Sequence, residues 1–175
     1  MKKSVKEELF SWMKSLLVAF LIVFICEQLI ITPKMVSGES MEPTYENKDR
    51  VIISKVSTPK RFDIITFHAP YSNHIYIKRI IGLPGDHLQM IDDQLYINNR
   101  LVKEPYLAPL KAAIGFGDLL TGNFDAIVPK GHYFVLGDNR QKSNDSLLFG
   151  PIHEKSLIGV VKFTYYPLDH AGFNK

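Results

Sequence analysis

The pattern of apolar and polar positions divides the chain into two unlike parts. The first part contains an unbroken apolar run, LLVAFLIVFIC, over 16–26, and apolar residues resume at 29–31 after two polar positions. The whole stretch 9–31 is long enough for a membrane-spanning helix, which needs about 20 residues. A cleavable signal peptide ends in small residues of the A-x-A kind, whereas this run ends in EQLIITPK. We therefore expect an uncleaved, single-pass transmembrane anchor over 9–31.

Basic residues before the apolar run predict the orientation of this anchor. They are Lys2, Lys3, Lys6 and Lys14. Because positive charge stays on the cytoplasmic side, the N-terminus (1–8) is expected in the cytoplasm and the rest of the chain outside the membrane. Glu27, within the stretch, leaves open the alternative of a buried helix in a soluble protein.

After Pro33 the pattern changes to short runs rich in Val, Ile, Tyr and Phe and bounded by Gly, Pro, Asn and Asp, as is typical of β-strands. These runs lie at 49–55, 63–68, 75–82, 88–91, 94–99, 133–137 and 157–167. No long run with a helical period follows Gly38. The expected fold is mainly β: an antiparallel β-sheet sandwich or partly open barrel.

The segment 87–128 has a pattern of its own. It carries a hairpin signal, DDQLYINNRLV, followed by a Gly-rich stretch with little periodicity. We expect this segment to form a small β-rich lobe inserted into the main extracytoplasmic domain. That domain is then made of 32–86 and 129–175.

Composition narrows the possible functions. The formal net charge of +3 is mild and the basic residues are spread along the chain, which argues against nucleic acid as a partner. The six histidines stand apart and the single cysteine, Cys26, lies in the apolar run, so we expect neither a metal site nor a cofactor.

The polar stretch SGESMEPT (37–44) follows the apolar part and contains a candidate nucleophile, Ser40. A serine hydroxyl needs a neighbouring base to remove its proton, and no histidine here has a sequence signature for that role. A lysine can take the proton when it is neutral. Since burial lowers a lysine pKa from about 10.4 by up to roughly 3–5 units, the candidate base is a lysine in a strongly apolar strand.

Lys78, in IYIKRIIG, meets this condition. Strand alternation places it on one face with Tyr76 and Ile80, and places Arg79 on the opposite face. On spacing alone the ordinary alternatives stay open: Lys78 as a charged edge-strand residue, and Ser40 as part of a polar turn.

Taken together and in order, these stretches resemble the type I signal peptidases, the membrane-bound serine–lysine proteases that remove signal peptides from exported proteins. An N-terminal anchor is followed by GESMEPT, DRVIISK (49–55), YIKRIIGLPGD (76–86) and GDNRQKSNDS (137–146). The short chain with one span is more similar to the Gram-positive form than to the larger Gram-negative one. The resemblance implies a location in the bacterial cell membrane, with the catalytic domain on the extracellular side.

The resemblance also implies roles for individual residues. Ser40 would attack the scissile carbonyl, Lys78 would be the general base, and the backbone N–H of Ser40 would be one oxyanion donor. Some members use a serine hydroxyl as a second donor at the position of Gly38, so that donor must come from backbone or water here. Met41 is expected to shape the turn that presents Ser40.

Further matches lie in the last motif. Ser143 matches the family serine that hydrogen-bonds the catalytic lysine. Asp145 matches a structural acid and is expected to pair with Arg79. Leu147 stands where many members have arginine, which removes one member of the salt-bridge network expected around Asp145.

The partners implied by the resemblance are the lipid bilayer and preproteins that carry signal peptides. Their cleavage sites would have small side chains, typically alanine, at the first and third positions before the cut. The enzyme would be monomeric. Two other hypotheses stay open: a serine–lysine self-cleaving regulator on a related β fold, and a membrane-anchored binding module that has kept the fold without the activity.

Overall fold

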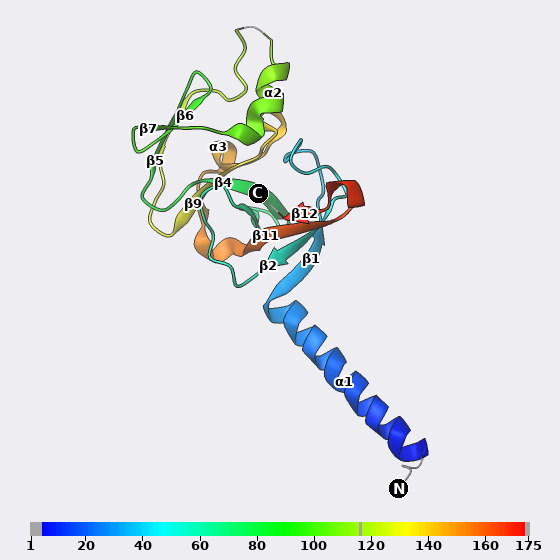
Figure 1. Ribbon diagram of the computed structural model, residues 1–175. Helices are drawn as coiled ribbons and strands as arrows, with labels where there is room; N and C mark the ends of the chain where they lie inside the picture. Colours follow the sequence, from blue (N-terminus) through cyan, green and yellow to red (C-terminus); the bar gives the residue numbers. More distant parts are fainter. Residues whose placement is uncertain (1–4, 116, 174–175) are drawn as a thin grey trace.

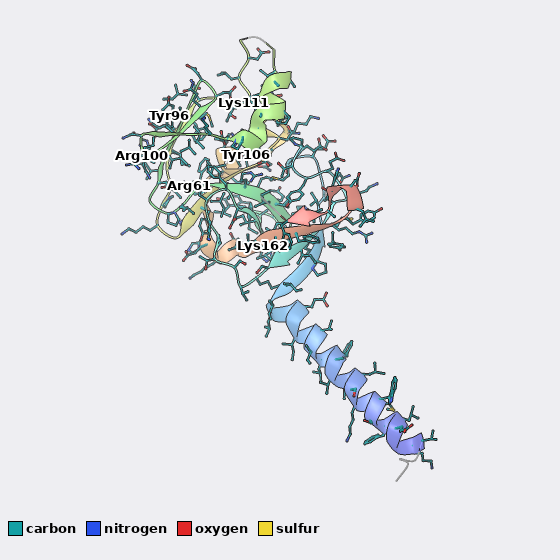
Figure 2. All side chains as sticks on the ribbon, viewed as in Figure 1. Arg61, Tyr96, Arg100, Tyr106, Lys111 and Lys162 are labelled. Carbon is teal, nitrogen blue, oxygen red and sulfur yellow. The ribbon has the colours of Figure 1, made fainter. Side chains whose placement is uncertain are left out.

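The computed structural model describes residues 5–115 and 117–173 and consists of a long helix and two antiparallel sheets (Figure 1). Helix α1 (Val5–Leu29) extends away from the β-rich body, and its side chains stand clear of the rest of the protein (Figure 2). Its segment Glu8–Ile25 is long and apolar enough to cross a membrane, and none of it is buried in the fold. An apolar helix that protein does not cover suits a lipid environment.

Helix α1 differs from the expected anchor 9–31 at its C-terminal end. It stops at Leu29, and Ile31 begins the first strand. The physical reason is local, because β-branched residues followed by a proline favour an extended backbone and end a helix. Of the basic residues used to predict the orientation, Lys2 and Lys3 lie outside the described residues.

The main sheet contains eight antiparallel strands. They are β1 (Ile31–Met35), β2 (Arg50–Ser54), β3 (Ile64–His68), β4 (Ile75–Gly82), β9 (His132–Leu136), β10 (Ile152–His153), β11 (Leu157–Tyr166) and β12 (Gly172–Phe173). Their order is β1-β2-β11-β3-β4-β9-β10, with β12 paired to β11. The end strands β1 and β10, both in the described part of the chain, do not pair with each other, and register shifts in β4 and β11 bend the sheet. Of the two expected architectures, the structure is therefore the partly open barrel.

The second sheet forms a lobe from the segment 87–128. Its strands are β5 (His87–Ile91), β6 (Gln94–Ile97), β7 (Arg100–Val102) and β8 (Phe124–Ile127), in the order β7-β6-β5-β8. A 3-10 turn (Pro105–Leu107) and helix α2 (Ala108–Ala113) lie between β7 and β8. The lobe shares its apolar core with Ile81, Phe134 and Leu136 of the main sheet, so the two sheets pack against each other.

All seven expected strands form, and each end lies within two residues of its predicted position. The elements that were not predicted are β1, β7, β8, β10, β12, α2 and α3 (Ser146–Phe149). Most of them are too short for a periodic pattern to appear, and β1 follows the apolar run without a break. Further 3-10 turns span Arg140–Lys142, Glu154–Ser156 and Leu168–His170.

Strand β4 lies at the centre of the apolar interior. It contributes Ile77 to one core cluster, Ile80 to a second and Ile81 to the core of the lobe. Each fully buried isoleucine stabilises the fold by about 1.5–3 kcal/mol. Charged side chains in the middle of β4 therefore have apolar neighbours on both faces, and two such residues, Lys78 and Arg79, lie there.

Candidate active site

The turn that carries Ser40 is fixed by the burial of Met41 and by backbone hydrogen bonds. Met41, the next residue, is fully buried in a core cluster, and its carbonyl accepts a hydrogen bond from the Tyr45 N–H at 3.0 Å. Gly38 has a φ of +92°, which favours glycine, and its N–H donates to Asn47 Oδ1 at 3.1 Å. Met41 thus packs beneath this turn in the core, while the Gly38 N–H is already engaged.

Lys78 reaches this turn from the middle of β4. Its side chain is buried, at 4% residue exposure, and its Nζ donates to Ser40 Oγ at 2.7 Å and to the Ile77 carbonyl at 2.9 Å. Across the sheet Lys78 is paired with Ile65, and its Nζ lies 5.3 Å from the centre of the Tyr76 ring. Two residues that stand 38 positions apart in the sequence are therefore in direct contact.

The surroundings of Lys78 change its proton affinity. Burial lowers the pKa of its amine from 10.5 to about 8, although the charges of Asp145 and Asp138 act in the opposite direction. A free lysine has fewer than about 1 in 100 molecules neutral at pH 8, whereas an amine of this pKa has roughly half. The neutral form that a base must have is thus well populated near pH 8.

Arg79 does not pair with Asp145, and that expectation was wrong. Its Nε donates to Asp138 Oδ1 at 2.8 Å and its NH2 group to Asp138 Oδ2 at 2.6 Å, while NH1 donates to the Phe62 carbonyl at 2.9 Å. Asp138 also accepts a hydrogen bond from Thr44 Oγ1 at 2.5 Å. This network joins β4 to the stretch after β9 and to the end of the turn that carries Ser40.

Asp145 instead supports the backbone of its own motif. It caps helix α3 by accepting from the Leu147 N–H at 3.1 Å, and it accepts from the Gly137 N–H at 3.0 Å. Leu147 itself is exposed. With leucine at this position, Asp145 satisfies its oxygens with backbone N–H groups, which is the ordinary role of a helix N-cap.

Ser143 lies beside the site, but it does not bond the lysine as expected. Its Oγ is buried and has no hydrogen-bond partner among the described residues. The close neighbour is Gly137: a Cβ placed there would overlap with Ser143 Oγ and with the Ser40 carbonyl oxygen. Only glycine fits at this position without displacing the backbone of the turn that carries Ser40.

Sequence reasoning missed the residues that join the turn of Ser40 to the loop after β9. Asn139 donates from its backbone N–H to the Ser40 carbonyl and from Nδ2 to the Glu39 carbonyl, both at 3.1 Å. Lys142 Nζ forms an exposed ion pair with Glu39 Oε2 at 3.1 Å. These residues stand inside the quoted stretches GESMEPT and GDNRQKSNDS, but nothing in either stretch alone indicates that the two meet.

A cleft of about 340 Å³ opens beside Ser40 and Lys78. Its walls come from β1, β2, β3 and β4 and from the two motif loops, and they are Lys34, Met35, Val36, Ser37, Gly38, Glu39, Ser40, Val51, Thr66, Ile75, Tyr76, Ile77, Lys78, Lys142 and Asn144. Within the described residues, no group of three His, Cys, Asp or Glu side chains could hold a metal ion. The arrangement is a serine hydroxyl and a buried amine that both line a largely apolar groove.

Comparison with known proteins identifies the family. Residues 9–166 match the family described as signal peptidase, peptidase S26. The chain belongs to this family. It is 38% identical to signal peptidase IB of Staphylococcus aureus (strain MRSA252) over 97% of this chain and 95% of the relative. It is 41% identical to signal peptidase I of Bacillus licheniformis over 94% of this chain and 92% of the relative.

A solved structure agrees with the fold. The crystal structure of a signal peptidase I from Enterococcus faecalis V583 aligns with a TM-score of 0.59 and 41% sequence identity, covering 60% of this chain and 97% of that one. The mainly β architecture and the resemblance to type I signal peptidases are confirmed. This S26 peptidase is an enzyme of the signal peptidase I type, so the hypothesis of a non-enzymatic binding module is dropped.

Proposed function

We propose that this S26 peptidase removes N-terminal signal peptides from exported preproteins, with Ser40 as the nucleophile and neutral Lys78 as the general base. The observation that carries the proposal is the 2.7 Å contact between Lys78 Nζ and Ser40 Oγ in buried surroundings. A nucleophile within hydrogen-bond distance of a base with a matched pKa is the basic unit of serine peptidase chemistry.

The reaction follows from this contact. Neutral Lys78 accepts the Ser40 hydroxyl proton as Oγ bonds to the scissile carbonyl carbon, and the carbonyl oxygen becomes an oxyanion. Protonated Lys78 then gives its proton to the leaving amine as the peptide bond breaks, and an acyl-enzyme remains on Ser40. Water, deprotonated by the same amine, releases the signal peptide and restores the Ser40 hydroxyl.

The oxyanion is expected to bind the Ser40 backbone N–H. This N–H donates no hydrogen bond to any described residue, so it is available for a ligand. The Gly38 N–H, held by Asn47 Oδ1, is not available in the same way. A water molecule would then supply the second donor that some members take from a serine hydroxyl.

The position of the cleft supports action at a membrane. Helix α1 leads directly into β1, and the cleft is lined by Lys34 and Met35 at the end of this strand and by Val36 just after it. We propose that α1 is a single membrane anchor in a bacterial cell membrane, with 1–8 in the cytoplasm and the catalytic domain outside. The catalytic domain would comprise 32–86 and 129–175, with 87–128 as an inserted lobe, and would act as a monomer.

The proposal is tested with purified full-length protein in phospholipid vesicles. The substrate is a preprotein with alanine at the first and third positions before the cleavage site. We expect Ser40→Ala and Lys78→Ala each to lower kcat/KM by about 10⁴-fold or more, because the two residues act as one unit. Cleavage is followed by the change in mobility of the mature protein and by N-terminal sequencing.

Matched control variants are Ser72→Ala and Lys60→Ala, which change an exposed serine and an exposed lysine outside the cleft. Both controls should cleave at the wild-type rate. Wild-type activity in either active-site variant would refute the assignment of Ser40 and Lys78. Cleavage of its own chain alone, with the preprotein left intact, would favour a self-cleaving regulator instead.

A further inference from the structure

A buried arginine, Arg140, connects the inserted lobe to the catalytic loop. Its NH2 group forms an ion pair with Glu104 Oε1 of the lobe at 2.5 Å, and its NH1 group donates to Thr121 Oγ1 of the lobe at 3.1 Å. Its Nε donates to the carbonyl of Gly137 at 3.0 Å. The side chains of Arg140 and Glu104 are only 1% and 2% exposed, so water screens their attraction very little.

The end of this network on the catalytic side lies against the nucleophile turn. Gly137 approaches Ser40 and Ser143 so closely that no other residue fits there. Asn139, between Gly137 and Arg140, donates hydrogen bonds to the carbonyls of Glu39 and Ser40. The loop 137–143, which we call the clamp loop, therefore holds the backbone on both sides of the Ser40 amide.

Other residues of the lobe hold the two partners of Arg140, Glu104 and Thr121, in place. Glu104 Oε1 also accepts from the Tyr106 hydroxyl at 2.6 Å, and the Tyr106 ring stacks 4.0 Å from the Arg79 guanidinium. Tyr106 lies where the lobe meets the main sheet (Figure 2). The Thr121 N–H donates to Asp93 Oδ1 at 2.6 Å, which fixes the second partner of Arg140.

Burying the ion pair of Arg140 and Glu104 costs free energy. Glu104 Oε2 is inaccessible to solvent and has no hydrogen-bond partner among the described residues. A buried ion pair often contributes little to stability compared with apolar residues of the same size. Stability alone is therefore a weak reason for this pair, whereas buried charged or polar groups in some proteins select one specific arrangement of the chain.

We propose that Arg140 is a positioning residue for peptide cleavage, and that the inserted lobe, through Glu104 and Thr121, holds the clamp loop against the nucleophile turn. The proposal rests on the proposed function. It assigns the lobe a part in setting the geometry of Ser40 and its amide, although no residue of the lobe lines the cleft. Small displacements of reacting groups lower rates steeply, so loosening the loop should affect the chemical step more than substrate binding.

The test compares Arg140→Lys, Glu104→Gln and the wild type in the vesicle assay. Lysine keeps the charge but cannot bond Gly137, Thr121 and Glu104 together, because it lacks the planar fork of arginine. We expect kcat per folded molecule to fall roughly 10- to 100-fold in either variant, with KM changed less than about twofold. Folded protein is quantified by circular dichroism and thermal unfolding, and kcat is measured well below the unfolding midpoint.

The matched control is Arg61→Lys. Arg61 pairs with Asp86 at 2.8 Å and also donates to the Ile81 carbonyl, but it does not contact the clamp loop. This variant should keep the wild-type kcat. The double variant Glu104→Gln/Arg140→Lys should be no slower than the more affected single variant, because both changes break one network, whereas Glu104→Gln and Arg61→Lys should combine as independent changes.

The outcomes separate the two proposals. A wild-type enzyme that cleaves no preprotein would refute the proposed function, whatever the variants do. An active wild type whose Arg140→Lys and Glu104→Gln variants match Arg61→Lys in kcat would overturn the role of Arg140. If Arg140→Lys does not fold, Glu104→Gln and Thr121→Val, which removes one bond of Arg140, must still lower kcat at unchanged KM, and wild-type rates in both would overturn the proposal.

Discussion

Strand β4 carries two buried basic side chains, one on each face, and their hydrogen-bond partners differ in charge. Lys78 and Arg79 are neighbours in the chain and are similarly buried, at 4% and 3% exposure. Arg79 meets a carboxylate, Asp138, through two short hydrogen bonds. Lys78 meets a hydroxyl and a carbonyl, Ser40 and Ile77, and no ion pair of its amine is formed within the described residues.

The difference decides which cation can do chemistry. Burial alone would lower the pKa of Arg79, but the hydrogen bonds and charge of Asp138 outweigh burial and raise it. Burial dominates at Lys78 and lowers its pKa to about 8, because the carboxylates of Asp145 and Asp138 act only from a distance. Arginine stays protonated at neutral pH with or without such a partner, whereas a buried lysine that lacks a direct carboxylate partner can lose its proton.

The largest stability effect should come from breaking the pair on the Arg79 face. Arg79→Met leaves Asp138 buried without its cation, so the free energy of unfolding should fall by about 3–5 kcal/mol. Urea unfolding followed by far-UV circular dichroism measures this loss. Replacing both partners, as in Arg79→Met/Asp138→Leu, should recover part of it, and a double variant less stable than the single one would contradict this interpretation.

On the other face of β4, replacing the buried cation Lys78 by methionine should stabilise the fold. The folded-state pKa of Lys78, about 8, lies below its ordinary value of 10.5. Folding therefore costs free energy wherever the unfolded lysine holds a proton, and this cost is complete below about pH 8 and absent above about pH 10.5. Lys78→Met should raise the free energy of unfolding at pH 7 by on the order of 3 kcal/mol while abolishing cleavage.

The pH dependence of this increase in unfolding free energy tests its cause. The difference in unfolding free energy between Lys78→Met and the wild type should shrink between about pH 8 and 10.5. Lys60→Met, at an exposed lysine, should show no such trend. A stability difference for Lys78→Met that does not change over this range would show that the amine is not desolvated.

The pH–rate profile sharpens the comparison further. With neutral Lys78 as the proposed base, kcat/KM should rise about tenfold per pH unit below about pH 8 and level off above it. Asp145 raises the pKa of Lys78, so Asp145→Asn should move the rising limb to lower pH. A profile that stays in place in Asp145→Asn would mean that this carboxylate does not influence the amine.

The smallest effect is expected for a third cation of the site, Lys142. Its ion pair with Glu39 is solvent-exposed on both sides, and such pairs contribute less than about 1 kcal/mol. Lys142→Met should therefore change the thermal unfolding midpoint by a few degrees at most. A loss as large as that of Arg79→Met would show that exposure does not explain the difference between these cations.

The sequence predicted the elements that have a long, regular pattern. The apolar run before Glu27 and the seven strand runs appear where expected, since each depends on local periodicity. Short elements such as β10 and β12, with two residues each, carry no period and form only because a neighbouring strand offers hydrogen bonds. The first residue of β1, Ile31, was assigned to the membrane anchor because the apolar residues continue from the helix into the strand without a break.

The sequence by itself also singled out Ser40 and Lys78, because a serine in a turn and a lysine between apolar strand residues stand in ordered, specific motifs. Only the tertiary structure decided the partners of the charged groups. Arg79 pairs with Asp138 and not with Asp145, Ser143 Oγ finds no partner among the described residues, and Arg140 bonds to the lobe. Such choices depend on distances of a few ångströms between segments far apart in the chain, and electrostatic and hydrogen-bond energies change steeply over those distances.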